Sequence, residues 1–187
     1  MNYKRILYTV LACLAVAGPL LAADVYNLDP AHTDVAFSID HLVINTVQGR
    51  FKELTGTVTL DDKNNLVEAK ATIQTKSVDT GIEKRDNHLR TADFFDAEKY
   101  PTVTFEGNKI TEEDGKKMLV GTLTMHGVTK PISLPYTIKG PIKDPWGNQR
   151  IGISAEKDIN RTDYGMKHFM GVGDEVKIRI NAEAVKK

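Results

Sequence analysis

Five histidines are the side chains of this sequence best suited to metal binding or acid–base chemistry: His32, His41, His88, His126 and His168. Metal sites usually combine histidines at short local spacing, such as His-x3-His, and no such pair occurs here. Asp29 lies close enough to His32 for an acid–base pair, but such pairs usually tie strand ends together. We therefore predict no metal, no cofactor and no catalytic residue.

Motifs for nucleophilic or phosphate chemistry are also missing from the sequence. There is no Gly-x-Ser-x-Gly elbow of a serine hydrolase. The run Gly171-Val172-Gly173-Asp174 lacks the third glycine of a dinucleotide loop and precedes a strand-like segment rather than a helix. Arg161 and Asp163 have the spacing of a structural ion pair. The sequence thus disfavours a hydrolase or a nucleotide-binding enzyme.

One segment, residues 77–101, combines helical signals with clustered polar and aromatic side chains. Thr80-Gly81-Ile82-Glu83 is a capping-box pattern and predicts a helix start, with a short further turn near 96–99 before Pro101. Arg85 and His88 fall on the same side of this helix, which suits an anionic or hydroxyl head group and equally suits a solvated face. Of the adjacent aromatics Phe94 and Phe95, one is expected in the core and the other in the core or facing a cavity.

Almost every other segment alternates apolar and polar residues, which is typical of strands with one buried face. The residues predicted to point inward lie in seven runs and one shorter pair: Val35, Phe37, Ile39, His41; Leu54, Gly56, Val58, Leu60; Val67, Ala69, Ala71, Ile73; Val103, Phe105; Leu119, Gly121, Leu123, Met125; Ile132, Leu134, Tyr136, Ile138; Ile151, Ile153, Ala155; Val176, Ile178, Ile180, Ala182, Ala184. Polar turns at 61–65, 112–115 and 144–148 predict antiparallel hairpins.

One helix is too little to cover such a sheet, so the sheet must close on itself as a barrel or stack as a sandwich. Several inward positions are Ala or Gly: Gly56, Ala69, Ala71, Gly121, Ala155, Ala182 and Ala184. Small residues in mid-strand leave room, although a tight contact between two sheets also uses them. We predict an all-β fold, an antiparallel eight-stranded barrel with a lumen, one helix and a short helical turn near 80–99.

The first residues read as an export signal. Lys4 and Arg5 precede an apolar run to Leu21, and small residues precede Asp24, so we predict a cleaved signal peptide over 1–23, with a boundary uncertain by one residue, and a single domain over 24–187. The alternative, an uncleaved anchor, is disfavoured because the run is shorter than the about 20 residues of a membrane span. The single cysteine, Cys13, falls in this segment. Without Lys4 and Arg5 the net charge is −2, which disfavours a nucleic-acid partner.

Several stretches distributed over residues 26–176 resemble the YceI-like family, whose members are lipocalin-like barrels exported to the bacterial periplasm. The matching stretches are Tyr26-Asn-Leu-Asp-Pro-Ala-His32, Phe37-Ser-Ile-Asp-His41, Ser77-Val-Asp-Thr80, Arg85-Asp-Asn-His-Leu-Arg-Thr-Ala-Asp-Phe-Phe-Asp96, Tyr100-Pro-Thr-Val-Thr-Phe105, Gly121-Thr-Leu-Thr-Met-His-Gly127, Arg161-Thr-Asp-Tyr-Gly165 and Val172-Gly-Asp-Glu-Val176. The resemblance implies a lumen that binds a long amphiphile, such as a polyisoprenoid, a quinone-like compound or a fatty-acid derivative.

On this basis we predict periplasmic (or secreted) binding, transport or storage of such a lipid, and no enzyme activity. The tunnel is predicted to be lined by Gly121 and by nine apolar residues: Phe37, Ile39, Val58, Ile73, Phe94, Phe105, Leu123, Ile153 and Ile178. His41, Arg85 or His88 would contact the polar end. Transient membrane contact and a homodimer are compatible with this function.

Two other functions remain open from the sequence. One is an enzyme that modifies a lipid inside the lumen, with His41 or His88 as the base. The other is a stress-related protein-interaction module with a solid core. Met166, Phe169 and Met170, in the loop before the last strand, suit either an irregular apolar ligand or a gap under a loop.

Overall fold

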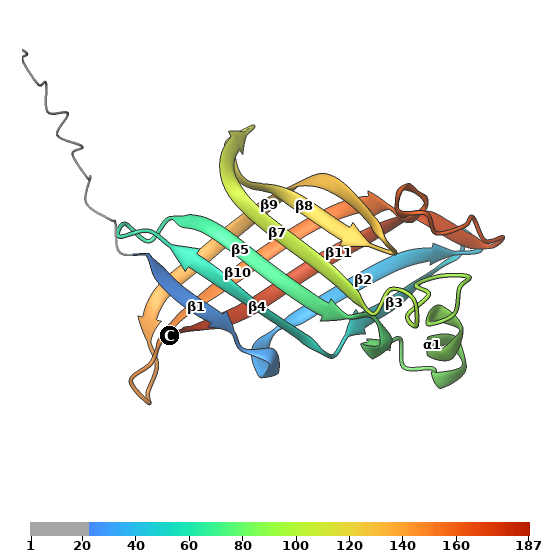
Figure 1. The fold of residues 1–187 in the computed structure, drawn as a ribbon, viewed down its shortest axis with the longest axis horizontal. Helices are drawn as coiled ribbons and strands as arrows, with labels where there is room; N and C mark the ends of the chain where they lie inside the picture. The colour runs from blue at the N-terminus through green and yellow to red at the C-terminus, as the bar shows by residue number, and fades with distance from the viewer. Residues whose placement is uncertain (1–22) are drawn as a thin grey trace, which may run out of the picture.

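The computed structural model describes residues 23–187, which form an elongated β-structure with one α-helix at one end (Figure 1). The predicted signal peptide, 1–23, lies outside the described residues except for its last position. Among the described residues no helix has the length and apolarity needed to cross a membrane. The elements are β1 (Asp24–Leu28), β2 (Asp34–His41), β3 (Asn45–Phe51), β4 (Leu54–Leu60), β5 (Leu66–Gln74), β6 (Val78–Asp79), α1 (Glu83–Leu89), β7 (Thr102–Glu113), β8 (Lys116–Met125), β9 (Val128–Lys143), β10 (Gln149–Asn160) and β11 (Val172–Lys186), with 3-10 turns at Pro30–His32, Thr75–Ser77 and Arg161–Tyr164.

Eight antiparallel strands close into a barrel, as the sequence predicts. Their order is β1-β4-β5-β7-β8-β9-β10-β11, and β1 closes the ring because it pairs with both β4 and β11. Closure removes the free sheet edges that an open sheet of this size would leave unpaired. The apolar face of the sheet is thereby enclosed without the need for covering helices.

Three further strands, β2, β3 and β6, extend the wall at the helical end; β2 is the predicted run at 35–41, whereas β3 and β6, like β1 of the ring, were not predicted. The long strand β11 pairs with β1 through its last residues and with β2 through its earlier ones. Strand β3 pairs with β2, and the two-residue strand β6 pairs with β3. Figure 1 shows these strands beside α1, at the end opposite to the C-terminus. The barrel is therefore longer on this side than its eight-strand ring.

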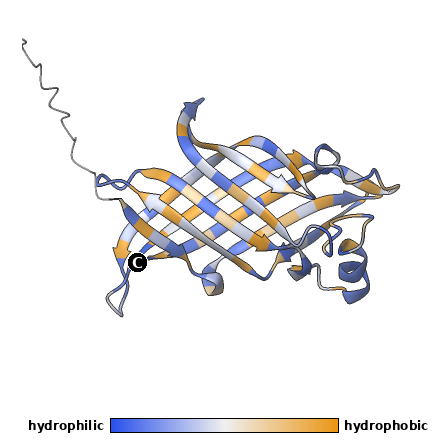
Figure 2. Ribbon diagram, viewed as in Figure 1, coloured by the Kyte–Doolittle hydropathy of each residue, from blue (hydrophilic) through white to orange (hydrophobic). Residues whose placement is uncertain are grey.

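Apolar and polar residues alternate along most strands, as Figure 2 shows. One predicted inward position on β5 is wrong: Val67 is exposed, and the neighbouring Leu66 is buried instead. The cause is a register irregularity, because Thr59 faces Glu68 whereas the next residue, Leu60, faces Leu66. A β-bulge shifts the alternation by one residue, and its position is not encoded in the apolar pattern.

In two of the predicted hairpin turns an aspartate side chain accepts hydrogen bonds from the backbone of the turn. At the β4–β5 turn the backbone N–H groups of Lys63 and Asn65 donate to the carboxylate of Asp61. At the β9–β10 turn the N–H groups of Trp146 and Asn148 donate to Asp144 in the same way. A short side-chain carboxylate that accepts these bonds replaces missing backbone partners and fixes the turn.

The helix is present, but its predicted capping box is not. The cap position is Ile82, which makes no side-chain cap, and the helix begins at Glu83. The Thr80 hydroxyl and backbone N–H instead donate to the buried carboxylate of Asp86. The predicted short turn is confirmed, since the N–H groups of Lys99 and Tyr100 donate to the carbonyl of Asp96 just before Pro101.

Candidate ligand-binding cavity

The barrel encloses an apolar cavity of about 170 Å³. Its wall includes side chains from β1 to β5 and from β7 to β11, so all eight barrel strands contribute. The volume is similar to that of an engineered apolar cavity of about 150 Å³ that stays dry and binds benzene. The empty space therefore admits an apolar group and gives water few hydrogen-bonding partners.

The end of the barrel away from α1 is filled with side chains. Tyr26, Leu60, Leu66, Ile151 and Ala184 pack together there and are almost completely buried. This cluster makes the cavity blind at that end, so a ligand must enter elsewhere.

At the other end of the cavity, aromatic rings form a continuous series. The ring centroids of Phe37 and Phe51, which both line the cavity, lie 5.8 Å apart. Phe51 in turn makes an edge-to-face contact with Phe95, at 5.4 Å, in the segment that follows α1. These rings are the groups that must shift if a long chain is to extend beyond the space now empty.

Seven of the predicted lining residues are found in the cavity wall: Phe37, Val58, Ile73, Phe105, Leu123, Ile153 and Ile178. Four of the small residues predicted to leave room are there too, namely Ala69, Ala71, Ala155 and Ala182. The interpretation of small inward residues as the source of a lumen therefore agrees with the structure.

Three residues predicted to line the tunnel are not in this wall. Phe94 is buried against His88 and Phe169 near α1. Ile39 lies one inward position beyond Phe37 on β2, outside the present cavity. Gly121 is needed for close strand packing, because a Cβ there would clash with the carbonyl oxygen of Glu106. A bulky residue at position 121 would consequently disturb the β7–β8 pairing rather than fill the lumen.

The three predicted polar contacts, His41, Arg85 and His88, also lie outside the cavity wall. His41 was expected on an inward face, but it is exposed at the end of β2. Arg85 donates to the hydroxyl and carbonyl oxygens of Thr80. His88 Nε2 is 3.0 Å from an Asp93 carboxylate oxygen. Their contact with a ligand head group stays a prediction.

Other structural pairs differ from the sequence-based expectation. Arg161 does not pair with Asp163 but with Asp174, at 2.9 Å, while Asp163 pairs with Lys130. The two loop methionines differ in burial: Met166 is buried in the core, whereas Met170 is exposed.

Phe51 was missed as a wall residue although a signal for it exists. The inward series Val47, Gly49, Phe51 on β3 has the period of two expected for a strand. The series was not recognised as a strand because it contains a glycine and its neighbours are mostly polar, which is typical of a loop.

The cavity wall is almost uncharged. Lys70 is its one ionisable Lys, Arg, Asp, Glu or His residue. The hydroxyl of Tyr136 is a further polar group, and burial raises the pKa of this phenol above its ordinary value, so it stays neutral over the physiological range. A wall of this kind favours an apolar chain and offers no nucleophile paired with a base.

Asp29, His32 and Glu183 bring three potential metal ligands together at the outer surface. His32 Nδ1 is 2.9 Å from an Asp29 oxygen, which agrees with the pairing considered from the sequence. However, the Arg150 guanidinium already donates to both Asp29 and Glu183, at 2.8 and 3.2 Å. This cation occupies the position that a metal would need, and we assign the cluster a structural role.

The Arg150 cluster predicts acid sensitivity. Hydrogen bonds from Arg150 lower the pKa of Asp29 and of Asp144 to about 2. The stabilisation of the folded state by these two ionised carboxylates is therefore complete above the ordinary carboxyl pKa of about 3.9. It is lost as the pH falls towards 2. Chemical denaturation at a series of pH values should show a shallower loss of unfolding free energy in Arg150→Met than in wild type over this window.

Arg179→Met, at an exposed position on β11, is the control and should follow the wild-type profile. Some acid sensitivity must persist in Arg150→Met, because backbone hydrogen bonds from Asn65 and Gly81 lower the pKa values of Asp61 and Asp79. Parallel profiles for wild type and Arg150→Met would show that the cluster contributes nothing to acid stability.

The fold and the cavity define a lipocalin-like antiparallel barrel with an apolar interior. Comparison with known proteins gives the same class. The YceI-like domain family model matches residues 26–184. The protein YceI of Escherichia coli O157:H7 is 40% identical over 173 residues, which cover 90% of each chain. The chain belongs to the YceI-like family.

Two solved structures extend the comparison. The Campylobacter jejuni YceI protein is 38% identical, with a TM-score of 0.70 over 86% of this chain and 96% of that one. A polyisoprenoid-binding domain from Saccharophagus degradans, implicated in plant cell wall breakdown, has a TM-score of 0.66 over 89% of this chain and 99% of that one. At 18% identity this second likeness concerns the fold alone.

Proposed function

We propose that this protein binds one long-chain amphiphile, a polyisoprenoid, quinone-like or fatty-acid-type lipid, with its apolar chain in the barrel cavity. The observation that carries the proposal is the blind cavity, which is enclosed by the strands and has an almost wholly apolar wall. The relative from Saccharophagus degradans, which is described as polyisoprenoid-binding, supports the choice of ligand class.

Desolvation of the chain supplies the driving force. Each buried methylene contributes about 0.8 kcal/mol, so a chain of about 20 carbons gives roughly 16 kcal/mol before costs. Association and ordering remove an estimated 4–15 kcal/mol. A short hydrophobic tail would leave no net gain, whereas a long one reaches a micromolar or tighter complex when these costs stay below about 8 kcal/mol. The protein should therefore select for chain length.

The present cavity holds only part of such a chain. Its volume is close to that of a benzene-sized site, so the remainder must lie beyond Phe37 and Phe51. The next inward residues on this side are Ile39 on β2 and Val176 on β11, which are half-buried and face each other across the strand pair. We infer that the tail enters the barrel and the polar end stays on the side of α1.

Binding accounts for the cavity better than catalysis does. The two histidines considered as bases, His41 and His88, lie outside the wall, and His88 is paired with Asp93. We further propose that the protein acts after export, in the periplasm, as a carrier or a store of its lipid. Transient membrane contact and a homodimer remain part of this proposal.

Organic extraction tests the ligand class. The protein is purified after export from a Gram-negative host without detergent, extracted, and analysed by mass spectrometry. We expect one class of long-chain amphiphile in near-stoichiometric amount, absent from a parallel extract of a periplasmic protein without a cavity. An empty extract, together with no uptake of added prenyl quinone, would contradict the proposal. Chemical conversion of the added lipid would favour the enzyme alternative.

A further inference from the structure

Five apolar side chains, defined here as the apolar tip, project from two adjacent loops at the α1 end. They are Leu42, Val43 and Ile44 in the β2–β3 turn and Phe169 and Met170 in the loop before β11. Val43, Ile44 and Met170 are 95%, 85% and 90% exposed. The two loops are in contact, because the backbone N–H of Leu42 donates to the carbonyl of Gly171 at 2.8 Å.

The turn that carries the tip is conformationally unfavourable for its residues. Leu42 and Val43 both have left-handed backbone conformations, with φ of 53° and 60°. Tight hairpin turns with positive φ strongly favour Asn and Gly, and a β-branched residue such as valine is an outlier there. The molecule thus holds exposed apolar residues where polar or small ones would be more stable. Such an outlier is a reason to look for a function.

The inner face of the cavity wall extends along β2 and β11 towards the apolar tip. Three successive cross-strand pairs of β2 and β11 point the same way: Val35 with Ile180, Phe37 with Ile178, and Ile39 with Val176. The first two pairs line the cavity, and the third lies between it and the tip. An apolar track therefore leads along the strands from the cavity towards the exposed turn, and His41, which is paired with Val172, lies between Ile39 and the apolar tip.

A lipid surface fits this tip better than a second copy of the chain. A stable protein interface needs about 20–30 residues on each side, whereas the tip offers five on two projecting loops. Its neighbouring charges are mixed: Asp40 accepts from Thr46, His168 pairs with Asp174, and Lys167 precedes His168 in the loop. Insertion of apolar side chains, rather than attraction to anionic lipid, must then drive binding.

We propose that the apolar tip docks the protein on a bilayer and aligns the apolar track with the membrane, so that the lipid chain passes between bilayer and cavity. This proposal rests on the proposed function for the passage of lipid, but the docking step itself does not require it.

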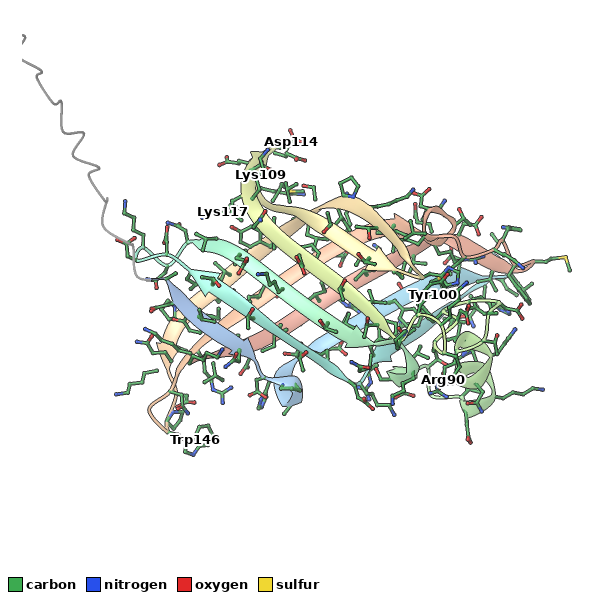
Figure 3. All side chains as sticks on the ribbon, in the orientation of Figure 1. Arg90, Tyr100, Lys109, Asp114, Lys117 and Trp146 are labelled. Atoms are coloured by element: carbon green, nitrogen blue, oxygen red, sulfur yellow. The ribbon has the colours of Figure 1, made fainter. Side chains whose placement is uncertain are left out.

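Flotation with phosphatidylcholine vesicles tests the docking step. The variant Leu42→Asn/Val43→Gly/Met170→Asn should bind vesicles at least about tenfold more weakly than wild type, because it removes three exposed apolar groups. Binding of wild type should change little between about 0.1 and 1 M salt or when phosphatidylglycerol is added. The control Ile142→Asn/Trp146→Asn removes exposed apolar residues at the opposite end, where Figure 3 shows Trp146 on the β9–β10 loop, and should bind like wild type.

A second readout separates a role in docking from a role in folding. Because Asn-Gly suits the turn, Leu42→Asn/Val43→Gly should melt at a temperature equal to or about 2–4 °C above that of wild type. The triple variant Leu42→Asn/Val43→Gly/Met170→Asn, here called the tip variant, should take up prenyl quinone from detergent solution as well as wild type does. Its uptake of prenyl quinone from vesicles should fall. Failure of uptake from detergent in wild type would refute the proposed function and leave docking to be judged by flotation alone.

Three results would overturn the docking proposal. Wild type that does not float with vesicles is the first, and a tip variant that floats as well as wild type is the second. The third is a wild type that dimerises through the tip, with dimerisation lost in the variant while vesicle binding persists. That outcome would assign the tip to a second copy of the chain.

Discussion

Replacement of both Ala71 and Ala155 by phenylalanine is expected to abolish lipid uptake and leave the barrel folded. The two alanines lie in the cavity wall on β5 and β10. One benzene-sized ring takes up a cavity of about 150 Å³, so two rings need more than the 170 Å³ available here and leave no room for a ligand. The second ring must displace neighbouring side chains, at an overpacking cost of about 1–3 kcal/mol, and the affinity for prenyl quinone should fall about 100-fold or more.

The matched control is Glu156→Phe, one residue along β10 on the outer face, where the side chain is exposed. It introduces the same ring without entering the cavity and should bind like wild type. Circular dichroism and the melting temperature verify folding in both proteins. A folded Ala71→Phe/Ala155→Phe protein with wild-type affinity would place the ligand outside the barrel.

Arg161→Met is expected to be the most destabilising single change in the chain's polar network. The Arg161 side chain is 3% exposed and donates to the carbonyls of Gly173 and Lys167 and to the Asp174 carboxylate, at 2.6 to 2.9 Å. Methionine would leave these acceptors without their donor, at a cost of about 3 kcal/mol. For a chain of this size the melting temperature should fall by about 6–12 °C in a thermal denaturation scan.

Lys130→Met is the control for the loss of one positive charge. Lys130 pairs with Asp163 at 3.4 Å, and both side chains are substantially exposed, so the change should stay within about 0.5 kcal/mol. Equal melting temperatures for Arg161→Met and Lys130→Met would mean that the buried hydrogen bonds of Arg161 do not hold the loop before β11.

The barrel could be predicted because its main signal is local. Alternation of apolar and polar residues identifies strands, and the shortage of helix requires the sheet to cover itself. Strands β1, β3 and β6 were not predicted because they are short or rich in polar residues and glycine. Their place depends on β11 being long enough to pair with two partners in succession, which is a tertiary property.

The cavity was predicted better than its polar end. Apolar wall residues such as Phe105 and Ile178 follow from strand period alone. His41 also has that period, but β2 has already left the enclosed part of the barrel when it reaches this residue. Side chains of α1 such as Arg85 are used within the segment itself, to bind Thr80. The capping box failed for the same reason, since Thr80 is held by Asp86.

The most direct test of lipid binding inside the barrel is native mass spectrometry of the exported protein during titration with a prenyl quinone. We predict a single bound molecule per chain for wild type and Glu156→Phe, and none for Ala71→Phe/Ala155→Phe. No mass increase in wild type, or the same increase in the filled variant, would contradict the claim that the barrel interior is the binding site.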